Sequence, residues 1–167
     1  CANGHSFDIA KEGYVNLLLV QQKKSKEPGD NPEMVQARRE FLQAGYYQPL
    51  CTAASQLLAP LNAQSLLDIG CGEGYYLAQL HDQLQAQLAP TNGAPAMIGF
   101  DISKWAIQSA ARRPLATWLV ASNRQIPLAA DSADCVLSLF GFPVFETFKA
   151  LLKSGGRAIV PGKPEES

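Results

Sequence analysis

Three glycines at alternate positions join a short apolar run to a stretch of helical composition. The segment reads Leu66-Leu67-Asp68-Ile69-Gly70-Cys71-Gly72-Glu73-Gly74-Tyr75-Tyr76. Glycine lets the backbone turn tightly and approach a ligand without a clash at a β-carbon. In open α/β sheets, ligands bind at the carboxyl ends of the strands, which is where this turn is expected. The turn is therefore a candidate binding site.

The spacing of these glycines discriminates between cofactors. A dinucleotide site requires G-x-G-x-x-G, but Tyr75 stands where the third glycine would be, and no Lys follows as a P-loop requires. Asp68 and Glu73 flank the turn and would repel a pyrophosphate. They suit a ligand with an amino group and a sulfonium charge, which is S-adenosylmethionine. The alternative is a glycine turn that only closes a strand–helix unit.

Polar residues follow two further apolar runs. Asp101 ends the run 96–100 and could accept both ribose hydroxyls, or it could cap the next helix. Residues after the run 117–121 could meet an adenine edge or form a polar loop. The candidate cofactor residues from these patterns are Asp68, Gly70, Gly72, Glu73, Gly74, Asp101, Ile102, Ser122 and Asn123.

The elements that must position these residues alternate along the chain. We expect strands at 65–69, 96–101, 117–121, 134–139 and 157–160. We expect helices at 73–87, at 103–113 with Ser103 as N-cap, and at 146–152, preceded by helical sequence at 33–59 that Gly45 interrupts and that resumes at about 48–58. This alternation predicts an α/β fold with a doubly wound, mostly parallel, Rossmann-like sheet and helices on both faces.

The composition is that of a globular domain. The chain has 167 residues, 47% hydrophobic and 17% charged, with a formal net charge of -1, so any surface for a polyanion must be local. No run of about 18 apolar residues predicts a membrane span, and no secretory signal is visible, so we expect a cytoplasmic protein. We expect its cysteines, Cys1, Cys51, Cys71 and Cys135, to be reduced.

Cys1 and His5 form a C-x-x-x-H pair that could complete a Cys₃His zinc site. The spacing alone equally fits a cysteine and a histidine without a shared role. Because the chain does not begin with Met, we expect it to be part of a longer protein. The first two cysteines of such a site would then lie upstream.

Two segments in the second half resemble signatures of class I methyltransferases. Residues 126–136 resemble the pattern PF-x-x-x-S-F-D-x-V, and residues 152–157 resemble the LKPGG turn before the fifth strand. Residues 1–18, the Pro28-Gly29-Asp30 segment and residues 33–34, 37–42 and 45–50 are similar to bacterial 23S rRNA (guanine-N1)-methyltransferases, which carry an amino-terminal zinc ribbon. The resemblance covers nearly the whole chain.

This resemblance implies roles for particular residues. Cys1 and His5 would bind a structural Zn²⁺, and Tyr47, Gly72 and Glu73 would contact S-adenosylmethionine. It also suggests RNA contacts at Lys11, Lys23, Lys24, Lys26, Arg38 and Arg39. Alternatively, these six basic residues lie on a solvent-exposed surface without an RNA partner, because residues 1–40 also hold six acidic residues.

The expected activity is methyl transfer to N1 of a guanine in a 23S ribosomal RNA hairpin. The alternatives are a class I methyltransferase acting on a small molecule or protein, and a nonenzymatic module that binds the cofactor or RNA. We divide the chain into a partial zinc ribbon and linker (1–33) and a methyltransferase core (34–167) whose carboxyl-terminal part lies beyond residue 167. A homodimer is among the possible assemblies.

Overall fold

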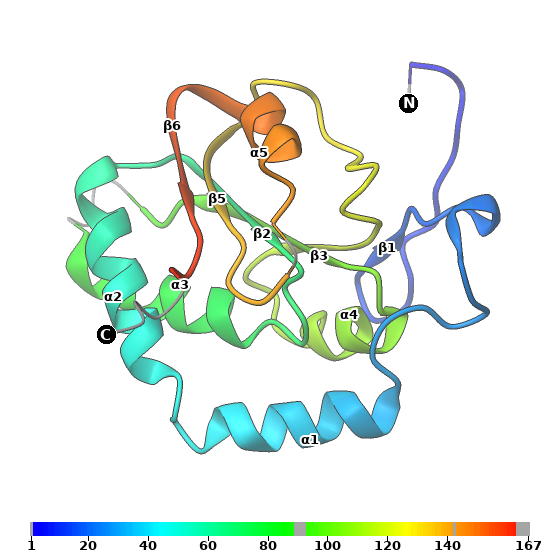
Figure 1. The fold of residues 1–167 in the computed structure, drawn as a ribbon, viewed down its shortest axis with the longest axis horizontal. Coiled ribbons are helices and arrows are strands. Elements are labelled where there is room, and N and C mark those ends of the chain that lie inside the picture. The colour runs from blue at the N-terminus through cyan, green and yellow to red at the C-terminus, as the bar shows by residue number, and fades with distance from the viewer. Residues whose placement is uncertain (1, 89–92, 142, 163–167) are drawn as a thin grey trace.

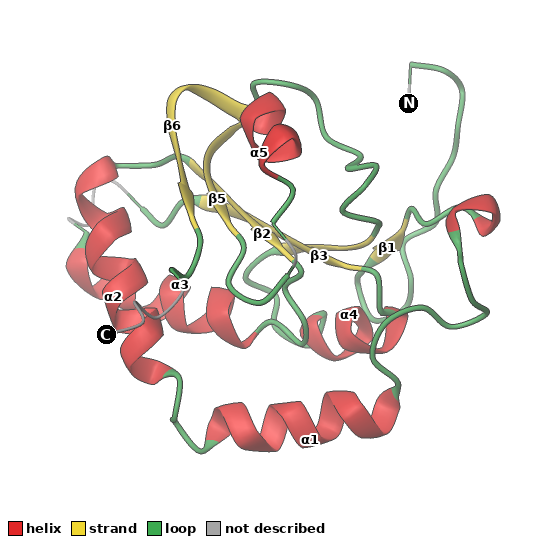
Figure 2. Cartoon of the chain, viewed as in Figure 1, coloured by secondary structure: helices red, strands yellow, loops and turns green. Residues whose placement is uncertain are grey.

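A computed structural model describes residues 2–88, 93–141 and 143–162 and shows an α/β fold built on one sheet (Figures 1 and 2). The described strands form a six-stranded sheet in the order β1-β4-β3-β2-β5-β6, and every neighbouring pair is parallel. The strands are β1 (Val15–Asn16), β2 (Ser65–Ile69), β3 (Ala96–Asp101), β4 (Thr117–Val120), β5 (Ala133–Leu137) and β6 (Leu152–Ile159).

Helices cover both faces of this sheet, as the sequence predicts. The helices are α1 (Pro32–Gln43), α2 (Gln48–Leu58), α3 (Tyr75–Gln87), α4 (Lys104–Ala110) and α5 (Phe145–Leu151), with two 3-10 turns, η1 (Val20–Gln22) and η2 (Ala59–Leu61). Leu66 points into a core formed with α2, α3 and α4, while Leu67 points into a second core that contains Phe148 and Leu151 of α5. Successive strand residues face opposite sides, so Leu66 packs in the first core while Leu67 and Ile69 pack in the second. Figure 2 shows α5 across the sheet from α3 and α4.

Most predicted elements lie where the pattern put them, and their ends differ for local reasons. Strands β2 and β3 and helix α2 have the predicted limits. Helix α3 begins at Tyr75 rather than at 73, because Gly74 adopts a left-handed φ of 87°. Helix α4 ends at Ala110 rather than at 113, and the amides of Arg112 and Arg113 bond three residues back in a tightened turn. Strand β6 begins five residues before the predicted start.

The amino-terminal segment contributes an edge strand that the sequence did not predict. Val15 pairs with Leu119 of β4, and the amide of Leu17 donates to the carbonyl of Val120 over 2.9 Å. Tyr14 and Leu18 are buried in the core, with 5% and 7% of their surface exposed. Residues 14–18 are therefore anchored to the sheet, while the division of the chain at residue 33 stays a prediction.

The cysteines that the structure describes are reduced and buried. Cys51, Cys71 and Cys135 carry free thiols, as expected, and Cys1 lies outside the described residues. Burial raises the pKa of Cys51 to about 11, so this thiol is not a reactive thiolate at neutral pH. Within the described ranges, no helix combines the length and the apolar character needed to cross a membrane.

Candidate functional site

The glycine turn after β2 depends on backbone conformations that glycine adopts readily. Gly70, Gly72 and Gly74 have φ of 75°, 57° and 87°. The amides of Gly70 and Cys71 both donate to the carbonyl of Phe100, over 2.9 and 3.0 Å. These bonds fix the turn to the end of β3, so that the two strand ends form one surface.

Asp101 links this turn to the loop that begins α4. Its Oδ2 accepts the backbone N–H of Gly72 over 3.0 Å, and its Oδ1 accepts that of Ser103 over 2.9 Å. Ser103 is the N-cap of α4, since its Oγ accepts from the amide of Ala106. The prediction for Ser103 is confirmed, and the alternative reading of Asp101 as the cap is wrong. Burial raises the pKa of Asp101, although both N–H donors oppose the shift.

A hollow of about 410 Å³ opens at the carboxyl ends of the central strands. We call it the acidic hollow, because its charged residues are Asp30 and Asp101 against Arg38. The Arg38 guanidinium Nε lies 2.9 Å from Oδ2 of Asp30. Its lining residues are Gly29, Asp30, Arg38, Ile69, Gly70, Gly72, Phe100, Asp101, Ile102, Ala121, Asn123, Phe140 and Gly141. The lining therefore carries a net negative charge, which suits a ligand with cationic groups.

Five of the ten residues predicted to contact the cofactor line the acidic hollow, namely Gly70, Gly72, Asp101, Ile102 and Asn123, and so does Arg38, which the resemblance suggested as an RNA contact. Tyr47, Asp68, Glu73, Gly74 and Ser122 do not line it. Tyr47 lies behind the wall of the hollow, because it packs edge-on against the lining residue Phe140 with ring centroids 5.2 Å apart. The Ser122 hydroxyl accepts from the amide of Arg124 and so helps to shape the loop after β4.

Asp68 lies inside the sheet, behind the glycine turn. It is 1% exposed, and its Oδ2 has no hydrogen-bond partner among the described residues. Burial, aided by the nearby charge of Asp101, raises its pKa to about 7. A carboxyl with that pKa is partly protonated at neutral pH. The neutral form of Asp68 has a smaller desolvation penalty in the core than the charged form would have.

Glu73 forms a buried ion pair instead of lining the hollow. Its Oε2 lies 2.8 Å from Nη2 of Arg113, and its side chain is 2% exposed. The carbonyl of Arg113 in turn accepts the indole N–H of Trp118 over 2.8 Å. A β-carbon on Gly74 would lie 2.8 Å from the same indole ring. Glu73 and Gly74 therefore hold the turn against Arg113 and Trp118, and neither residue lines the hollow.

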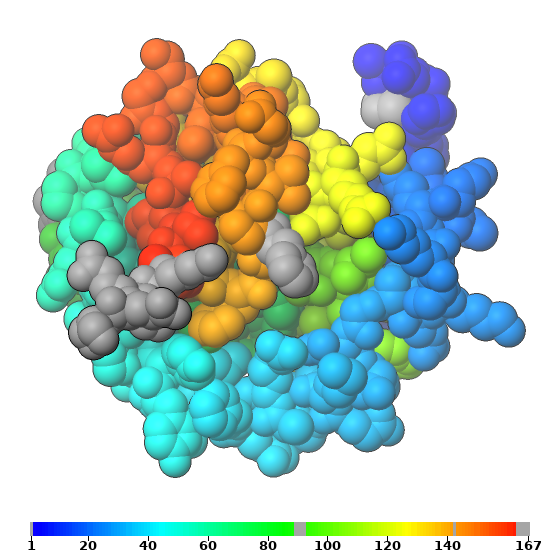
Figure 3. Space-filling view, in the orientation of Figure 1, coloured from blue at the N-terminus to red at the C-terminus, as the bar shows by residue number. Residues whose placement is uncertain are grey.

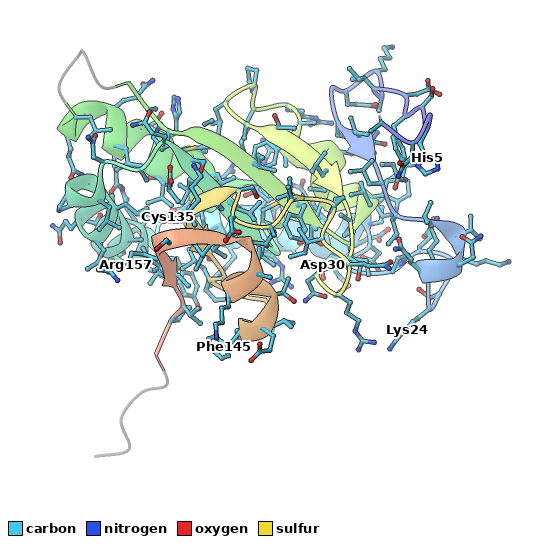
Figure 4. The ribbon with its side chains drawn as sticks, turned by 90° about the horizontal axis from the view of Figure 1, so that it is seen from above. His5, Lys24, Asp30, Cys135, Phe145 and Arg157 are labelled. Carbon is cyan, nitrogen blue, oxygen red and sulfur yellow. The ribbon has the colours of Figure 1, made fainter. Side chains whose placement is uncertain are left out.

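Sequence reasoning missed the wall that the segment before α1 adds to the hollow. A β-carbon on Gly29 would lie 2.8 Å from Cβ of Ser103, so only glycine fits there without a shift. The Ser103 hydroxyl donates to the carbonyl of Asp30 over 2.6 Å. Figure 4 shows Asp30 nearer the sheet than Lys24, which lies at the periphery. The Pro-Gly-Asp sequence predicts a turn, but nothing in the neighbouring sequence predicts that this turn packs against Ser103.

The predicted zinc pair cannot be placed as a pair. Cys1 lies outside the described residues, and His5 lies in the amino-terminal segment before β1 (Figure 4). Where the structure describes the chain, no three His, Cys, Asp or Glu side chains converge on a common point that could hold a metal ion.

Comparison with known sequences gives two family matches. The model for the methyltransferase domain matches residues 66–162, and the model for the RlmA amino-terminal zinc ribbon matches residues 1–26. The chain is 32% identical over 166 residues to a 23S rRNA (guanine(748)-N(1))-methyltransferase from Streptomyces fradiae, which covers 96% of this chain and 55% of the relative. The chain spans about half the length of the curated relatives it matches, 54% to 57%.

Solved structures share the fold. A protein from Methanococcus maripaludis, described as a candidate S-adenosyl-L-methionine-dependent methyltransferase, superposes with a TM-score of 0.64 at 18% identity, over 83% of this chain and 67% of that chain. The plantazolicin methyltransferase BpumL in complex with SAH gives a TM-score of 0.55 at 21% identity, over 74% of this chain and 49% of that chain. The predicted fold class is thus confirmed. The chain belongs to the methyltransferase domain family and begins with a segment of the RlmA zinc-ribbon type.

Proposed function

We propose that the acidic hollow binds S-adenosylmethionine and that the protein transfers its methyl group to N1 of a guanine in 23S ribosomal RNA. The observation that carries the proposal is the junction of the glycine turn and Asp101 in a hollow of negative lining, within a methyltransferase domain. This junction lies at the carboxyl edge of the sheet, where α/β proteins bind their ligands.

The residues of the hollow fit this cofactor chemically. Gly72 lines the hollow, and a β-carbon there would meet nothing within 4 Å, so the turn leaves free space for a ligand. Asp101 offers carboxylate oxygens to ribose hydroxyls, and Asn123 offers an amide to an adenine edge. Asp30 adds a second carboxylate toward cationic groups. S-adenosylmethionine supplies a methyl group activated by the positive charge of its sulfur.

The protein's contribution to the reaction is alignment. Ile69, Phe100 and Phe140 give the hollow apolar walls that exclude water, while the carboxylates and the glycine turn fix the orientation of the ligand. The guanine N1 lies on the Watson–Crick edge, so the base must be unpaired or turned out of a helix to reach the hollow.

Two comparisons support ribosomal RNA as the substrate. The first 26 residues match the RlmA zinc ribbon, and the curated relatives are named for guanine-N1 methylation of 23S rRNA. We further propose that the amino-terminal segment binds a structural Zn²⁺, with Cys1 and His5 among its ligands, and that the protein acts in the cytoplasm. A four-ligand zinc site would leave no open position for chemistry, so its role would be to dock RNA.

Two measurements test the proposal in separate steps. Titration calorimetry of this chain with S-adenosylmethionine should show one binding site, and no binding would contradict the assignment of the hollow. The full-length protein should then transfer labelled methyl groups to a guanine-containing 23S rRNA hairpin, with 1-methylguanosine identified by nucleoside mass spectrometry. Cofactor binding without RNA methylation would instead indicate another methyl acceptor or a nonenzymatic module.

A further inference from the structure

A second hollow lies beside the acidic one at the same edge of the sheet. It has a volume of about 140 Å³, and Ile102 lines both hollows. We call it the basic hollow, and the polar and aromatic residues in its lining are Asn16, Lys23, Lys26, Glu27, Lys104 and Trp105. The amino-terminal segment forms its outer wall, on the side of the molecule where Figure 3 shows that segment in blue.

The basic hollow has the opposite charge to its neighbour. Lys23, Lys26 and Lys104 line it against the single carboxylate of Glu27, which gives an excess of two positive charges. None of these three lysines lies within ion-pair distance of a carboxylate in the described part of the chain, whereas Arg38, Arg113 and Lys153 each have such a partner. Glu12, outside the hollow, lies close enough to Lys104 for an electrostatic interaction, so in a chain of net charge -1 the local excess of positive charge rests mainly on Lys23 and Lys26.

The other polar groups of the basic hollow are mostly donors as well. The Asn16 Oδ1 accepts from the amide of Leu18 over 3.1 Å, so its NH₂ group remains available to donate. Trp105 is half-buried, and the Lys104 ammonium lies 5.7 Å from the centre of its ring. Several donors against one carboxylate favour a ligand rich in anionic oxygens, and an aromatic ring beside them favours one that also carries flat bases.

We propose that the basic hollow binds a phosphate of the RNA strand that presents its guanine to the acidic hollow, and that Trp105 contacts an adjoining nucleotide. The inference rests on the proposed RNA substrate and adds the site that holds the strand. Lysine ammonium groups bind phosphates as point charges, and single-stranded RNA is recognised by stacking on aromatic side chains. An acidic peptide would satisfy the lysines but would make no use of the ring of Trp105.

The first test compares two triple variants of equal charge. In Lys23→Gln/Lys26→Gln/Lys104→Gln the basic hollow loses its positive charges, and in Arg112→Gln/Lys149→Gln/Arg157→Gln the same charge is lost from exposed residues outside both hollows. The affinity for a fluorescein-labelled RNA hairpin with a guanine in its loop is measured from 50 to 200 mM KCl. A lost phosphate contact lowers the salt dependence, so the slope of log K against log salt should fall by about 0.7 in the first variant, as expected for one phosphate of a single strand.

The control variant should bind the RNA within about twofold of the parent protein, while the first variant should bind about fivefold more weakly at 100 mM KCl. Equal loss in both variants would overturn the proposal, because it would show a general charge effect. Both variants should keep the parent's affinity for S-adenosylmethionine and its melting temperature. A parent chain that binds the cofactor but not the RNA would overturn the RNA substrate together with this site, whereas the variant comparison tests the site alone.

The second test uses the two tryptophans of the chain. Trp105 lines the basic hollow, whereas Trp118 is 2% exposed in the core. RNA should quench the tryptophan fluorescence of the parent and of Trp118→Phe, and the quenching should be lost in Trp105→Phe. Retained quenching in Trp105→Phe would contradict a contact at this ring. Polyglutamate at equal charge should not displace the RNA, and displacement would assign the hollow to acidic peptides instead.

Discussion

The backbone N–H of Gly72 donates to Oδ2 of Asp101 over 3.0 Å, and this bond joins the two residues on which the cofactor assignment depends. Gly72 belongs to the turn after β2, and Asp101 ends β3. The carboxylate therefore has two tasks, because it holds the turn in place and faces the acidic hollow. A substitution at Asp101 should affect both.

Asp101→Ala should weaken the affinity for S-adenosylmethionine by about 1–3 kcal/mol, the usual cost of a lost hydrogen bond to a charged group. It should also lower the melting temperature, because the amides of Gly72 and Ser103 lose their acceptor. Calorimetric titration and thermal unfolding measure the two effects. Asp82→Ala, which removes an exposed carboxylate from α3, is the control and should change neither. A lower melting temperature with unchanged affinity would show that Asp101 is purely structural.

Gly72→Val should abolish cofactor binding, because the added side chain would project into free space that the ligand needs. The left-handed φ of 57° makes this substitution strained in any case, so stability must be controlled. Gly13→Val is the matched variant, since Gly13 has a φ of 94° and nothing within 4 Å of its β-carbon position but lies in the turn before β1 and does not line the hollow. Both variants should unfold at lower temperature. Only Gly72→Val should fail in a binding titration, and retained affinity there would contradict the placement of the ligand.

The sequence predicted the parts of this site that depend on local signals. The limits of β2 and β3 follow from apolar runs that end at glycine or aspartate, and the parallel sheet then brings Gly72 and Asp101 to one edge. Residues that reach the site through distant contacts carry no such signal. Asp30 joins the hollow through the hydroxyl of Ser103, which is 73 positions away, and the two residues of β1 are too short a strand to show a periodicity.

The same limit applies to the packing of Glu73 and Gly74, whose contact with the cofactor stays a prediction. Their positions in the glycine turn are typical of cofactor contacts, but their neighbours in space come from another element. Glu73 is paired with Arg113, and Gly74 packs on Trp118. Neither partner can be found from spacing within the turn. The third glycine of the motif is therefore required by packing against β4.

Trp118 leads to a prediction on Gly99, in the middle of β3. A β-carbon at this position would lie 2.5 Å from Cζ3 of the Trp118 ring and 3.1 Å from the sulfur of Cys71. Gly99→Ala should therefore lower the free energy of unfolding by about 1–3 kcal/mol, as overpacked cores do. Urea unfolding measures the loss, and Gly162→Ala, where a β-carbon meets nothing within 4 Å, should cost much less. If the ring is the cause, the loss should shrink in a Trp118→Leu background, and an undiminished loss there would argue against it.

Asp68 should make the protein less stable as the pH rises from about 4 to about 7. Burial raises its folded pKa from about 4 to about 7, so between these values the folded state binds more protons than the unfolded state. The free energy of unfolding then falls with increasing pH across that window, by at most about 4 kcal/mol. Asp68→Asn removes this titration, so its stability relative to the parent should increase from pH 5 to pH 8 in urea unfolding. A constant difference between the two proteins over that range would show that Asp68 does not titrate there.

Removal of zinc should loosen only the beginning of the chain. A longer protein that carries the whole ribbon should hold close to one equivalent of zinc when purified without added metal, and less than about half an equivalent would count against the site. Chelation should then speed hydrogen exchange at amides before Ala10. The amide of Leu17 should stay protected, because it bonds to the carbonyl of Val120, and Tyr14 and Leu18 remain packed in the core. Cofactor affinity should not change, since the acidic hollow is lined only by residues from 29 onward. Loss of protection at Leu17, or loss of cofactor binding on chelation, would show that the metal supports the fold of the core as well as the segment before β1.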